Sequence, residues 1–495
     1  MLLDMAGDGF GDRVAVGPPS TGLTFAALGD RARRAARWLV DKQVQNAVLV
    51  DTNSEVVPIL LYGSGFAGVP FAPLNYRLAD EQLKALLART APSVAVVEAG
   101  VADRVGEIEG VELVERADFL EAIDATDPIE GEVSFDPDDI AVLLFTSGTT
   151  GEPKAAVLRH RHLTSYVMTS VEFMGASEDE AAVVSVPPYH VAGISAVLSA
   201  TFAGRRTVYL EAFSPEAWVA ACRDGAVTQA MVVPTMLGRI LDVLERDGEA
   251  LPALRHLSYG GGRMPTPVVE RALALLPHVD FVNAYGLTET SSTVSVLSPE
   301  DHRAAIASDD PAVRARLGSV GRPLPGLEVT VRGPEGDVLG PGEQGEVWVR
   351  GEQVAGEYLG REGSEDAGWF ATRDGGWFDD EGYLFLTGRL DDVIVRGAEN
   401  ISPGEIEAVL VEHPAVHEVA VVGIPDTEWG ESVAAAVVLE PGGEATEEEL
   451  QHWVRARLRS SRMPEHIQFR VELPYNETGK LLRRVIKSEL TSTFG

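Results

Sequence analysis

The chain has 495 residues, more than a single hydrophobic core usually supports, so we expect two or more domains. Its net charge of −35, from 41 basic and 76 acidic residues, argues against nucleic acid or an anionic membrane surface as a partner. No basic segment precedes an apolar core near Met1, and no apolar run approaches about 18 residues, so we expect no membrane insertion and a cytoplasmic protein.

The first part of the chain alternates helical and strand patterns. Thr24 can cap the first helix, and an apolar strand precedes the second. This rhythm predicts a mostly parallel sheet, with surface elements in the acidic, poorly patterned stretch at 101–139. The predicted helices are 24–42, 55–68 and 79–89, and the predicted strands are 47–50 and 93–98.

Three glycines in the second predicted helix, Gly63, Gly65 and Gly68, formally match the dinucleotide-binding pattern GxGxxG. A dinucleotide fold needs these glycines in a strand-to-helix turn, whereas here they lie within the helix. Close packing against a neighbouring helix is therefore our interpretation.

A run of hydroxyls and glycines, TSGTTGEPK, follows the apolar strand predicted at 140–145. Glycines let backbone N–H groups approach a ligand, hydroxyls donate hydrogen bonds and a lysine adds positive charge, so the run predicts a cradle for phosphate. No Gly-Lys pair closes it, which excludes the loop of P-loop NTPases. The candidate ligand residues are Thr146, Ser147, Gly148, Thr149, Thr150, Gly151 and Lys154.

Strands and helices continue to alternate up to about residue 290. Three predicted strands end in polar or glycine-containing loops, near residues 146, 260 and 285. Because the carboxyl ends of strands in an open parallel sheet face one crevice, we expect the ligand there. The further predicted elements are a helix at 162–174, an apolar helix opening from the turn at 187–193, and strands at 182–186, 206–210, 230–233, 256–259 and 280–283.

The pattern changes after residue 318. Short β-like pieces separated by Gly and Pro turns predict an antiparallel or barrel-like lobe, and a compact α+β unit follows it. We therefore predict an α/β protein with a large N-terminal domain, 1–389, of parallel-type sheets with helices plus a β-barrel-like lobe. A small α+β C-terminal domain is predicted at 390–495.

These segments together resemble the adenylate-forming superfamily, which contains acyl-CoA synthetases, carrier-domain amino-acid adenylating modules and beetle luciferases. The resemblance spans nearly the whole chain. TSGTTGEPK resembles the phosphate loop of the family, YHVAG at 189–193 its aromatic-His motif beside the carboxylate pocket, and YGLTE at 285–289 its adenine and magnesium motif. Asp374 and Arg389 fall where the family binds the ribose hydroxyls, and Lys480 resembles its mobile catalytic lysine.

The resemblance implies an AMP-forming ligase that uses ATP and Mg²⁺ to activate a carboxylic acid as an acyl-adenylate and then transfers the acyl group to CoA. It assigns catalysis to Lys480, Thr288, Glu289 and His190, with Glu289 as the metal ligand, and a mobile C-terminal domain that turns about Asp391. A lysine suits the charge on transferring phosphoryl oxygens, and a carboxylate suits Mg²⁺. The remaining nucleotide- and CoA-binding candidates are Gly260, Gly261, Gly262, Asn283, Ala284, Tyr285, Gly286, Asp374, Arg389, Gly397 and Ala398.

Three residues depart from the family pattern. Arg373 precedes the ribose-binding aspartate where glycine is usual, and Arg263 follows Gly262 where Ala-Pro is common. Ala398 stands where many CoA ligases carry the glycine that lines the pantetheine tunnel, and its β-carbon would narrow that path. CoA remains the expected acceptor. The alternative is delivery to a carrier protein, an amine or another nucleophile, including activation of unusual oxyanions for nitrogen chemistry.

Apolar residues near these motifs suggest a fatty or aromatic acid as the small-molecule substrate. Amino acids are less expected, because amino-acid modules usually carry an aspartate where Tyr189 and His190 stand. A catalytically inert nucleotide-binding protein on the same fold is the alternative from another class, although the charged candidates argue against it. The apolar residues concerned are Val191, Ile194, Val233, Met236 and Val294.

Overall fold

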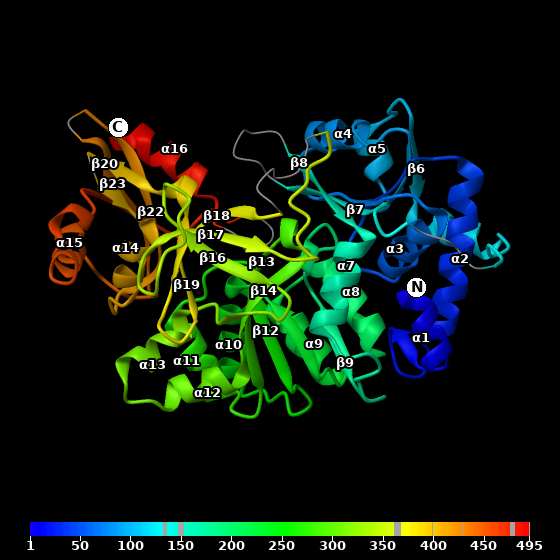
Figure 1. The fold of residues 1–495 in the computed structure, drawn as a ribbon, viewed down its shortest axis with the longest axis horizontal. Coiled ribbons are helices and arrows are strands. Elements are labelled where there is room, and N and C mark those ends of the chain that lie inside the picture. Colours follow the sequence, from blue (N-terminus) through cyan, green and yellow to red (C-terminus); the bar gives the residue numbers. More distant parts are fainter. Residues whose placement is uncertain are drawn as a thin grey trace.

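The computed structural model describes residues 1–131, 136–146, 153–360, 368–397, 399–427, 429–475 and 481–494. Two large sheets with their helices make up most of the N-terminal part, and the C-terminal part is a separate unit at the opposite end of the molecule from the N-terminus (Figure 1). The predicted α/β class, with a distinct C-terminal domain, is confirmed. Among the described residues, no helix is long and apolar enough to cross a membrane.

The first sheet has the strand order β6-β5-β3-β4-β7-β8. Its neighbours pair in parallel, as predicted, up to β7, which instead forms an antiparallel hairpin with β8. The sequence reading missed β8, because only a loop and a helix were expected after residue 146. The strands are β3 (Asn46–Val50), β4 (Phe71–Pro73), β5 (Ser93–Val97), β6 (Val111–Glu115), β7 (Ile140–Thr146) and β8 (Lys154–Arg159).

Residues 101–139 hold more regular structure than the surface elements that we predicted. They contain α5 (Val101–Val105), the edge strand β6 and α6 (Arg116–Asp124). Phe119 of α6 is fully buried and packs edge-on against Trp38, with ring centroids 5.1 Å apart. The short strand β6 carries two glutamates in five residues, which hid its pattern.

Helices α2 (Phe25–Lys42), α3 (Val56–Ala67) and α8 (Val191–Ala203) share a core with β3, β5 and β7. Thr24 caps α2 as predicted, because its Oγ1 accepts a hydrogen bond from the Ala27 N–H at 3.2 Å. A β-carbon at Gly63 would lie only 2.8 Å from the Ala35 Cβ. Gly63 therefore allows α2 and α3 to pack closely, which confirms the packing interpretation for this glycine, whereas Gly68 ends α3 with a left-handed backbone at φ of 71°.

The second sheet has the order β15-β14-β13-β12-β11-β9-β10-β1-β2 and is parallel from β13 to β1. The prediction that a strand ends at residue 283 is wrong. Strand β13 continues to Leu287 because it pairs antiparallel with β14, so Tyr285 lies inside the strand. The strands are β1 (Val14–Val16), β2 (Leu23–Thr24), β9 (Ala181–Val184), β10 (Arg206–Tyr209), β11 (Gln229–Val232), β12 (His256–Gly260), β13 (Asp280–Leu287), β14 (Ser292–Leu297) and β15 (Arg322–Pro323).

Three helices pack on this second sheet, and together with residues of β11, β12 and β13 they form a second hydrophobic core. A single 3₁₀ turn, η1 (Thr288–Thr290), separates β13 from β14. A helix that we expected at 162–174 begins two residues earlier and ends sooner, as α7 (His160–Ser170). The three packing helices are α9 (Pro215–Asp224), α10 (Pro234–Asp247) and α11 (Thr266–Leu275).

The lobe predicted after residue 318 is an antiparallel sheet of β16 (Glu328–Arg332), β17 (Gly345–Arg350), β18 (Phe370–Phe378) and β19 (Leu384–Arg389). The turn η3 (Leu390–Asp392) leads from β19 into the C-terminal domain. That domain has its own sheet, β21-β20-β23-β22, with β24 parallel to β23. Its strands are β20 (Ile394–Arg396), β21 (Glu399–Ile401), β22 (Val416–Asp426), β23 (Gly430–Leu439) and β24 (His466–Arg470).

Side chains alternate between the two faces of β22 and β23, so each face of this C-terminal sheet buries a different core. One face packs on α14 (Pro403–Val411) and α15 (Glu447–Arg455), through residues such as Val421 and Val433. The other packs on α16 (Arg483–Phe494), through residues such as Ala420 and Ala434. The domain therefore has cores of its own.

Candidate active site

A short segment, residues 353–359, joins the two N-terminal sheets. On one side it pairs with β8, where the Val157 N–H donates to the Glu357 carbonyl at 3.0 Å. On the other side the Ala355 N–H donates to the Glu289 carbonyl at 2.8 Å. The segment therefore brings β8, which follows the predicted phosphate loop, next to the turn η1 at the end of β13.

Tyr358, in the same segment, stands between two residues that the sequence placed in separate motifs. Its Oη donates a hydrogen bond to Glu289 Oε1 at 2.6 Å. Lys154 Nζ lies 5.4 Å from the centroid of the Tyr358 ring, a distance at which a cation is attracted to the ring face. Glu289 is 8% exposed. Lys154, Tyr358 and Glu289 thus form one cluster, and a single oxygen of this shielded carboxylate is engaged by the phenol.

A second cluster joins Tyr285, Asp374 and Arg389. Strands β18 and β19 place Asp374 opposite Arg389, and Arg389 Nη1 donates to Asp374 Oδ1 at 3.0 Å. Tyr285 Oη donates to the other oxygen, Oδ2, at 2.6 Å. Asp374 is 8% exposed, so both bonds lie in a partly desolvated setting where charge-assisted hydrogen bonds are strong. Two predicted site residues, Tyr285 and Arg389, therefore converge on the carboxylate of a third, Asp374.

The charges in this second cluster shift two pKa values. Burial and then the Asp374 carboxylate raise the pKa of the Tyr285 phenol well above its usual value. Burial lowers the pKa of Arg389, but the Asp374 carboxylate, together with Asp391 and Tyr285, offsets this and holds that pKa above its usual value. The arrangement therefore keeps Tyr285 as a neutral donor and Arg389 as a cation.

Arg373, one of the departures from the family pattern, has a left-handed backbone with φ of 62°. Its neighbours fix this conformation, since Thr372 Oγ1 accepts from the Asp374 N–H at 3.1 Å and donates to the Val347 carbonyl at 2.7 Å. A left-handed backbone favours glycine, which gives a physical reason for the glycine that the family usually has here. The Arg373 side chain itself is exposed.

His190 is the residue that precedes the first turn of α8, and its carbonyl accepts a hydrogen bond from the Gly193 N–H at 2.9 Å. Its ring lies 6.4 Å from the Tyr189 ring, which in turn meets the Tyr76 ring edge-on at 5.7 Å. His190 is partly exposed. The histidine of the predicted aromatic-His motif therefore lies beside two tyrosine rings at the start of α8.

The predicted residues around the end of β12 lie in two adjacent strands. Gly260 pairs with Ala284 of β13, and Asn283 Nδ2 donates to the Ser319 carbonyl at 2.9 Å. Gly286 pairs across with Thr293 of β14. Gly261 and Gly262, which follow β12, are exposed, and Thr288, which follows β13, is partly exposed.

Several predicted site residues lie outside the described residues. These are Ser147, Gly148, Thr149, Thr150 and Gly151 of the predicted phosphate loop, together with Lys480 and Ala398. The two ends of this loop are held together, because Thr146 pairs with Lys154 and the Thr146 Oγ1 donates a hydrogen bond to the Lys154 carbonyl at 3.4 Å. Gly397 is exposed, and its N–H donates to the Trp429 carbonyl at 2.6 Å.

The five apolar residues from which the sequence suggested a fatty or aromatic acid do not form one cluster. Val191 and Ile194 belong to the core between the sheets, Val233 and Met236 to the core of the second sheet, and Val294 to a core that includes Tyr285. These residues therefore pack into three separate cores.

Tyr358 and Gln353 are the residues of this region that the sequence reading missed. Gln353 is 2% exposed, and its Nε2 donates to the carbonyls of Thr290 at 3.0 Å and Thr293 at 2.8 Å. The only signal available was a glutamine and a tyrosine in a polar, glycine-containing stretch between predicted strands. Their importance depends on contacts with residues 60 or more positions earlier in the chain.

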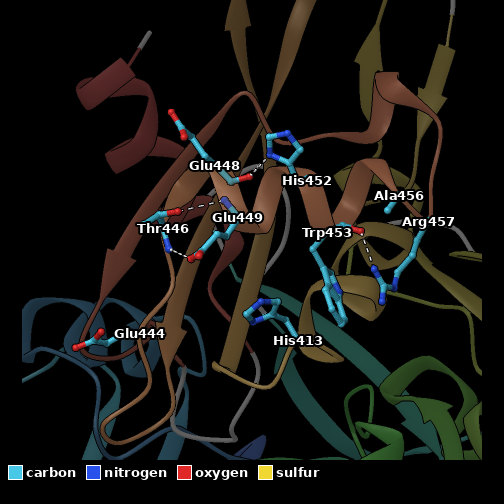
Figure 2. Close-up of a pocket in the computed structure, with 9 residues that line it drawn as sticks. All are labelled: His413, Glu444, Thr446, Glu448, Glu449, His452, Trp453, Ala456 and Arg457. Atoms are coloured by element: carbon cyan, nitrogen blue, oxygen red, sulfur yellow. Dashed lines mark hydrogen bonds between the residues drawn. The ribbon is translucent and has the colours of Figure 1, made fainter.

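A depression of about 660 Å³ lies along α15, on the C-terminal domain (Figure 2). The side chains that line it interact with other residues of the same domain. Trp453 Nε1 donates to the Val409 carbonyl at 2.8 Å, and the Arg457 guanidinium carbon lies 3.4 Å from the Trp453 ring centroid. His452 Nδ1 donates to the Glu448 carbonyl at 2.7 Å. The predicted site residues do not line it, and α15 lies at the far end of the molecule from β7 (Figure 1).

Comparison with known proteins gives matches along nearly the whole chain. A family model described as AMP-binding enzyme matches residues 3–359, and one described as AMP-binding enzyme C-terminal domain matches residues 405–480. A feruloyl-CoA synthase of Amycolatopsis is 34% identical over 97% of this chain and 96% of its own. A 2-succinylbenzoate–CoA ligase of Bacillus licheniformis is 32% identical over 95% and 96%. The structure of o-succinylbenzoate CoA synthetase from Bacillus subtilis, in complex with its acyl-adenylate intermediate, is similar with a TM-score of 0.84, 28% identity and coverage of 98% and 97%.

Proposed function

We propose that this chain, which belongs to the AMP-binding enzyme family, is an AMP-forming acid:CoA ligase. Two relatives at 34% and 32% identity over nearly full length are named for the ligation of an acid to CoA, which supports acid activation followed by transfer to CoA. The carrier-protein acceptor that the sequence left open gains no support from these relatives.

The observation that carries the proposal is the convergence of Tyr285 and Arg389 on the Asp374 carboxylate. A carboxylate has about four lone-pair sites, so Asp374 can accept further hydrogen bonds from the two ribose hydroxyls of ATP. Arg389 balances its charge, and Tyr285, anchored by its hydroxyl, can offer a ring face to adenine. We assign these three residues to the nucleoside part of ATP.

The triphosphate would lie toward the cluster of Lys154, Tyr358 and Glu289. Lys154 offers a positive charge beside the loop 147–152, whose glycines and hydroxyls suit phosphate oxygens. Glu289 suits Mg²⁺, because it is a shielded carboxylate whose Oε1 alone is hydrogen-bonded to another described residue. Mg²⁺ commonly binds through one or two protein carboxylates plus substrate phosphates, and it would neutralise charge on those phosphates.

In the first half-reaction a carboxylate oxygen of the acid attacks the α-phosphorus of ATP. The bond from that phosphorus to the bridging oxygen breaks, and pyrophosphate leaves with the bonding electron pair. Negative charge develops on the equatorial oxygens, so the protein acts by positioning and electrostatic stabilisation. We assign this role to Lys480 as a point charge and to the Thr288 hydroxyl as a donor. We place His190 beside the acid, at the entrance to α8.

In the second half-reaction the CoA thiol loses its proton to solvent and its sulfur bonds to the acyl carbon. The bond from that carbon to the phosphate oxygen breaks, and AMP leaves with the bonding electron pair. We place the domain boundary between residues 389 and 390 and the hinge at Asp391, within the turn η3. Rotation there would withdraw Lys480 and present the segment 396–402, which joins β20 to β21 and contains Gly397 and Ala398, to the thiol. The position of Gly397, exposed and bonded to the Trp429 carbonyl, is compatible with a surface for the acceptor.

We propose an aromatic acid as the substrate. The feruloyl and succinylbenzoyl groups in the names of the two relatives are both aromatic. A fatty acid, the other class that the sequence suggested, is the alternative, because the structure of a Mycobacterium tuberculosis fatty acyl CoA synthetase is also similar, at 28% identity and a TM-score of 0.76.

Product analysis tests the proposal. The protein is incubated with ATP and Mg²⁺, with and without CoA, and with ferulic, 2-succinylbenzoic and decanoic acids in turn. We expect an acyl-CoA and AMP when CoA is present, and an acyl-adenylate and pyrophosphate when it is not. Formation of ADP and phosphate, or of an adenylate that does not react with CoA, would contradict the assignment. A product only with decanoic acid would contradict the aromatic substrate class.

A further inference from the structure

Arg263, another departure from the family pattern, links the large domain to the C-terminal domain. It follows the glycines 260–262 at the end of β12, and its Nη1 donates a hydrogen bond to the Gly404 carbonyl at 2.6 Å. Gly404 lies in the first turn of α14, 141 positions later in the chain. A residue beside the proposed nucleotide loop thus reaches the domain that is proposed to move.

The absence of a side chain at Gly404 allows this approach. A β-carbon there would lie 3.0 Å from Arg263 Nη1 and 3.0 Å from the Thr387 carbonyl oxygen. Ser402 Oγ also donates to the Thr387 carbonyl, so the start of α14 is held against β19 as well. Thr387 lies just before the turn η3, whereas Arg263 belongs to a separate part of the large domain. A rotation about η3 would therefore disturb the Arg263 bond more than the contacts beside the hinge.

Charged groups of the C-terminal domain surround this bond. Arg263 as a whole is exposed, but the protein around its guanidinium lowers its pKa, the Glu407 carboxylate raises that pKa and the Arg483 guanidinium lowers it, so both groups lie within electrostatic range. Arg483 Nη2 donates to Glu407 Oε2 at 2.7 Å, which pairs the two charges with each other. Arg483 follows Lys480 by three positions in the sequence. The observed orientation therefore turns the Arg483 end of the domain toward Arg263.

We infer that Arg263 is a positioning residue, which holds the C-terminal domain through the Gly404 carbonyl in the orientation that serves adenylation. This inference rests on the proposed two-step function. Loss of the bond shifts the domain away from that orientation. Adenylation then slows, whereas acyl transfer from a preformed adenylate, which needs the rotated domain, does not slow.

Four variants separate this role from a general loss of structure. Arg263→Ala removes the donor, and Arg263→Lys keeps a positive charge with a different reach. Gly404→Ala crowds the same contact from the other domain. Arg271→Ala is the matched control, because Arg271 bonds to Asp242 and Glu245 within the large domain, at 2.7 and 3.0 Å.

Two rates are measured for each variant: ATP/pyrophosphate exchange at saturating ATP, and single-turnover acyl transfer from a synthetic adenylate. A hydrogen bond from a charged donor is worth enough to change an orientation equilibrium about tenfold. We expect Arg263→Ala and Gly404→Ala to lower the exchange rate about tenfold without slowing transfer, Arg263→Lys to recover part of the loss, and Arg271→Ala to match the wild type. Equal slowing of both steps in Arg263→Ala would overturn the inference.

Energy transfer between two dyes measures the orientation of the domains independently of the reaction. Dyes are attached to cysteines introduced at Met168 and Val471, which are 52% and 95% exposed and lie in different domains. The native Cys222 is buried and should not take up dye, so the energy transfer reports the distance between the domains. We expect the energy-transfer distribution of ligand-free protein to shift in Arg263→Ala and Gly404→Ala and to stay unchanged in Arg271→Ala. An unchanged distribution in both test variants would refute the positioning role. Lack of exchange by the wild type with any acid would instead refute the proposed function, and the dye measurement would still decide on the contact.

Discussion

Replacing Tyr358 by phenylalanine removes one hydroxyl and leaves the aromatic ring in place. That hydroxyl donates to Glu289 Oε1 at 2.6 Å, while the ring faces Lys154 at 5.4 Å. Glu289 keeps the backbone bonds that its carbonyl accepts from Ala355 and Gly356. The substitution therefore frees the carboxylate of the proposed metal ligand without removing its support from the main chain.

The size of the effect follows from the kind of bond that is lost. A hydrogen bond to a charged group contributes about 1.5–3 kcal/mol, which corresponds to about 10- to 150-fold in an equilibrium constant. Removing a hydrogen-bond partner of a metal ligand typically lowers metal affinity by about 10- to 100-fold. We therefore expect the Mg²⁺ concentration for half-maximal adenylation to rise by about 10- to 100-fold in Tyr358→Phe, with a smaller change in rate at saturating Mg²⁺.

The assay is a Mg²⁺ titration of ATP/pyrophosphate exchange, accompanied by calorimetric titration of Mg²⁺ into protein with a non-hydrolysable ATP analogue. Tyr383→Phe is the matched control, because Tyr383 Oη donates to Asp301 Oδ1 at the same distance of 2.6 Å, outside the proposed site. We expect the control to change stability and to leave the Mg²⁺ dependence as it is in the wild type. If Tyr358→Phe also leaves the Mg²⁺ dependence unchanged, Glu289 does not act as the metal ligand that we propose.

Two further predictions concern the second cluster and the stability of the fold. Asp374→Asn removes the charge that pairs with Arg389, so the KM for ATP in the exchange assay should rise at least about tenfold, and an unchanged KM would argue against ribose binding there. Burial lowers the pKa of His162 to about 4, and its Nδ1 accepts a hydrogen bond from the Arg159 N–H at 3.2 Å. Below about pH 6.5 the unfolded chain therefore binds more protons than the folded protein. The free energy of unfolding should fall as the pH falls from that value toward 4. His162 should lower the free energy of unfolding by about 2 kcal/mol between pH 7 and 5. Denaturant unfolding of the wild type should show this decrease, and His162→Asn should lack it. Equal decreases in the two proteins would contradict the assignment to His162.

Much of the fold follows from local pattern. The Thr24 cap, the packing of the glycine-containing helix α3 on α2 and the alternation of strands with helices each depend on residues close together in sequence. The family resemblance also assigned Tyr285, Asp374 and Arg389 to one site, and the Tyr285 and Arg389 side chains both bond to Asp374. Periodicity was sufficient for the strands and helices, whereas the grouping of these three residues came from the resemblance.

The remaining features depend on contacts between distant segments. Strand β13 extends beyond residue 283 because β14 returns to pair with it, and β8 forms because it pairs with β7. Tyr358 enters the site only because its segment pairs with β8 on one side and with the Glu289 turn on the other. The partner of Arg263 is a backbone carbonyl, which no side-chain pattern could indicate.

The most direct test of acid adenylation is ATP/pyrophosphate exchange across a panel of aromatic, fatty and amino acids, with the wild type compared with Lys480→Ala. A lysine that stabilises the charge on the transferring phosphoryl group contributes mainly in the transition state, so its loss should lower the rate. We predict exchange that depends on an aromatic acid in the wild type and is lost or strongly reduced in Lys480→Ala. Normal exchange in Lys480→Ala would remove that lysine from catalysis, and the absence of exchange with every acid would contradict adenylation by this protein.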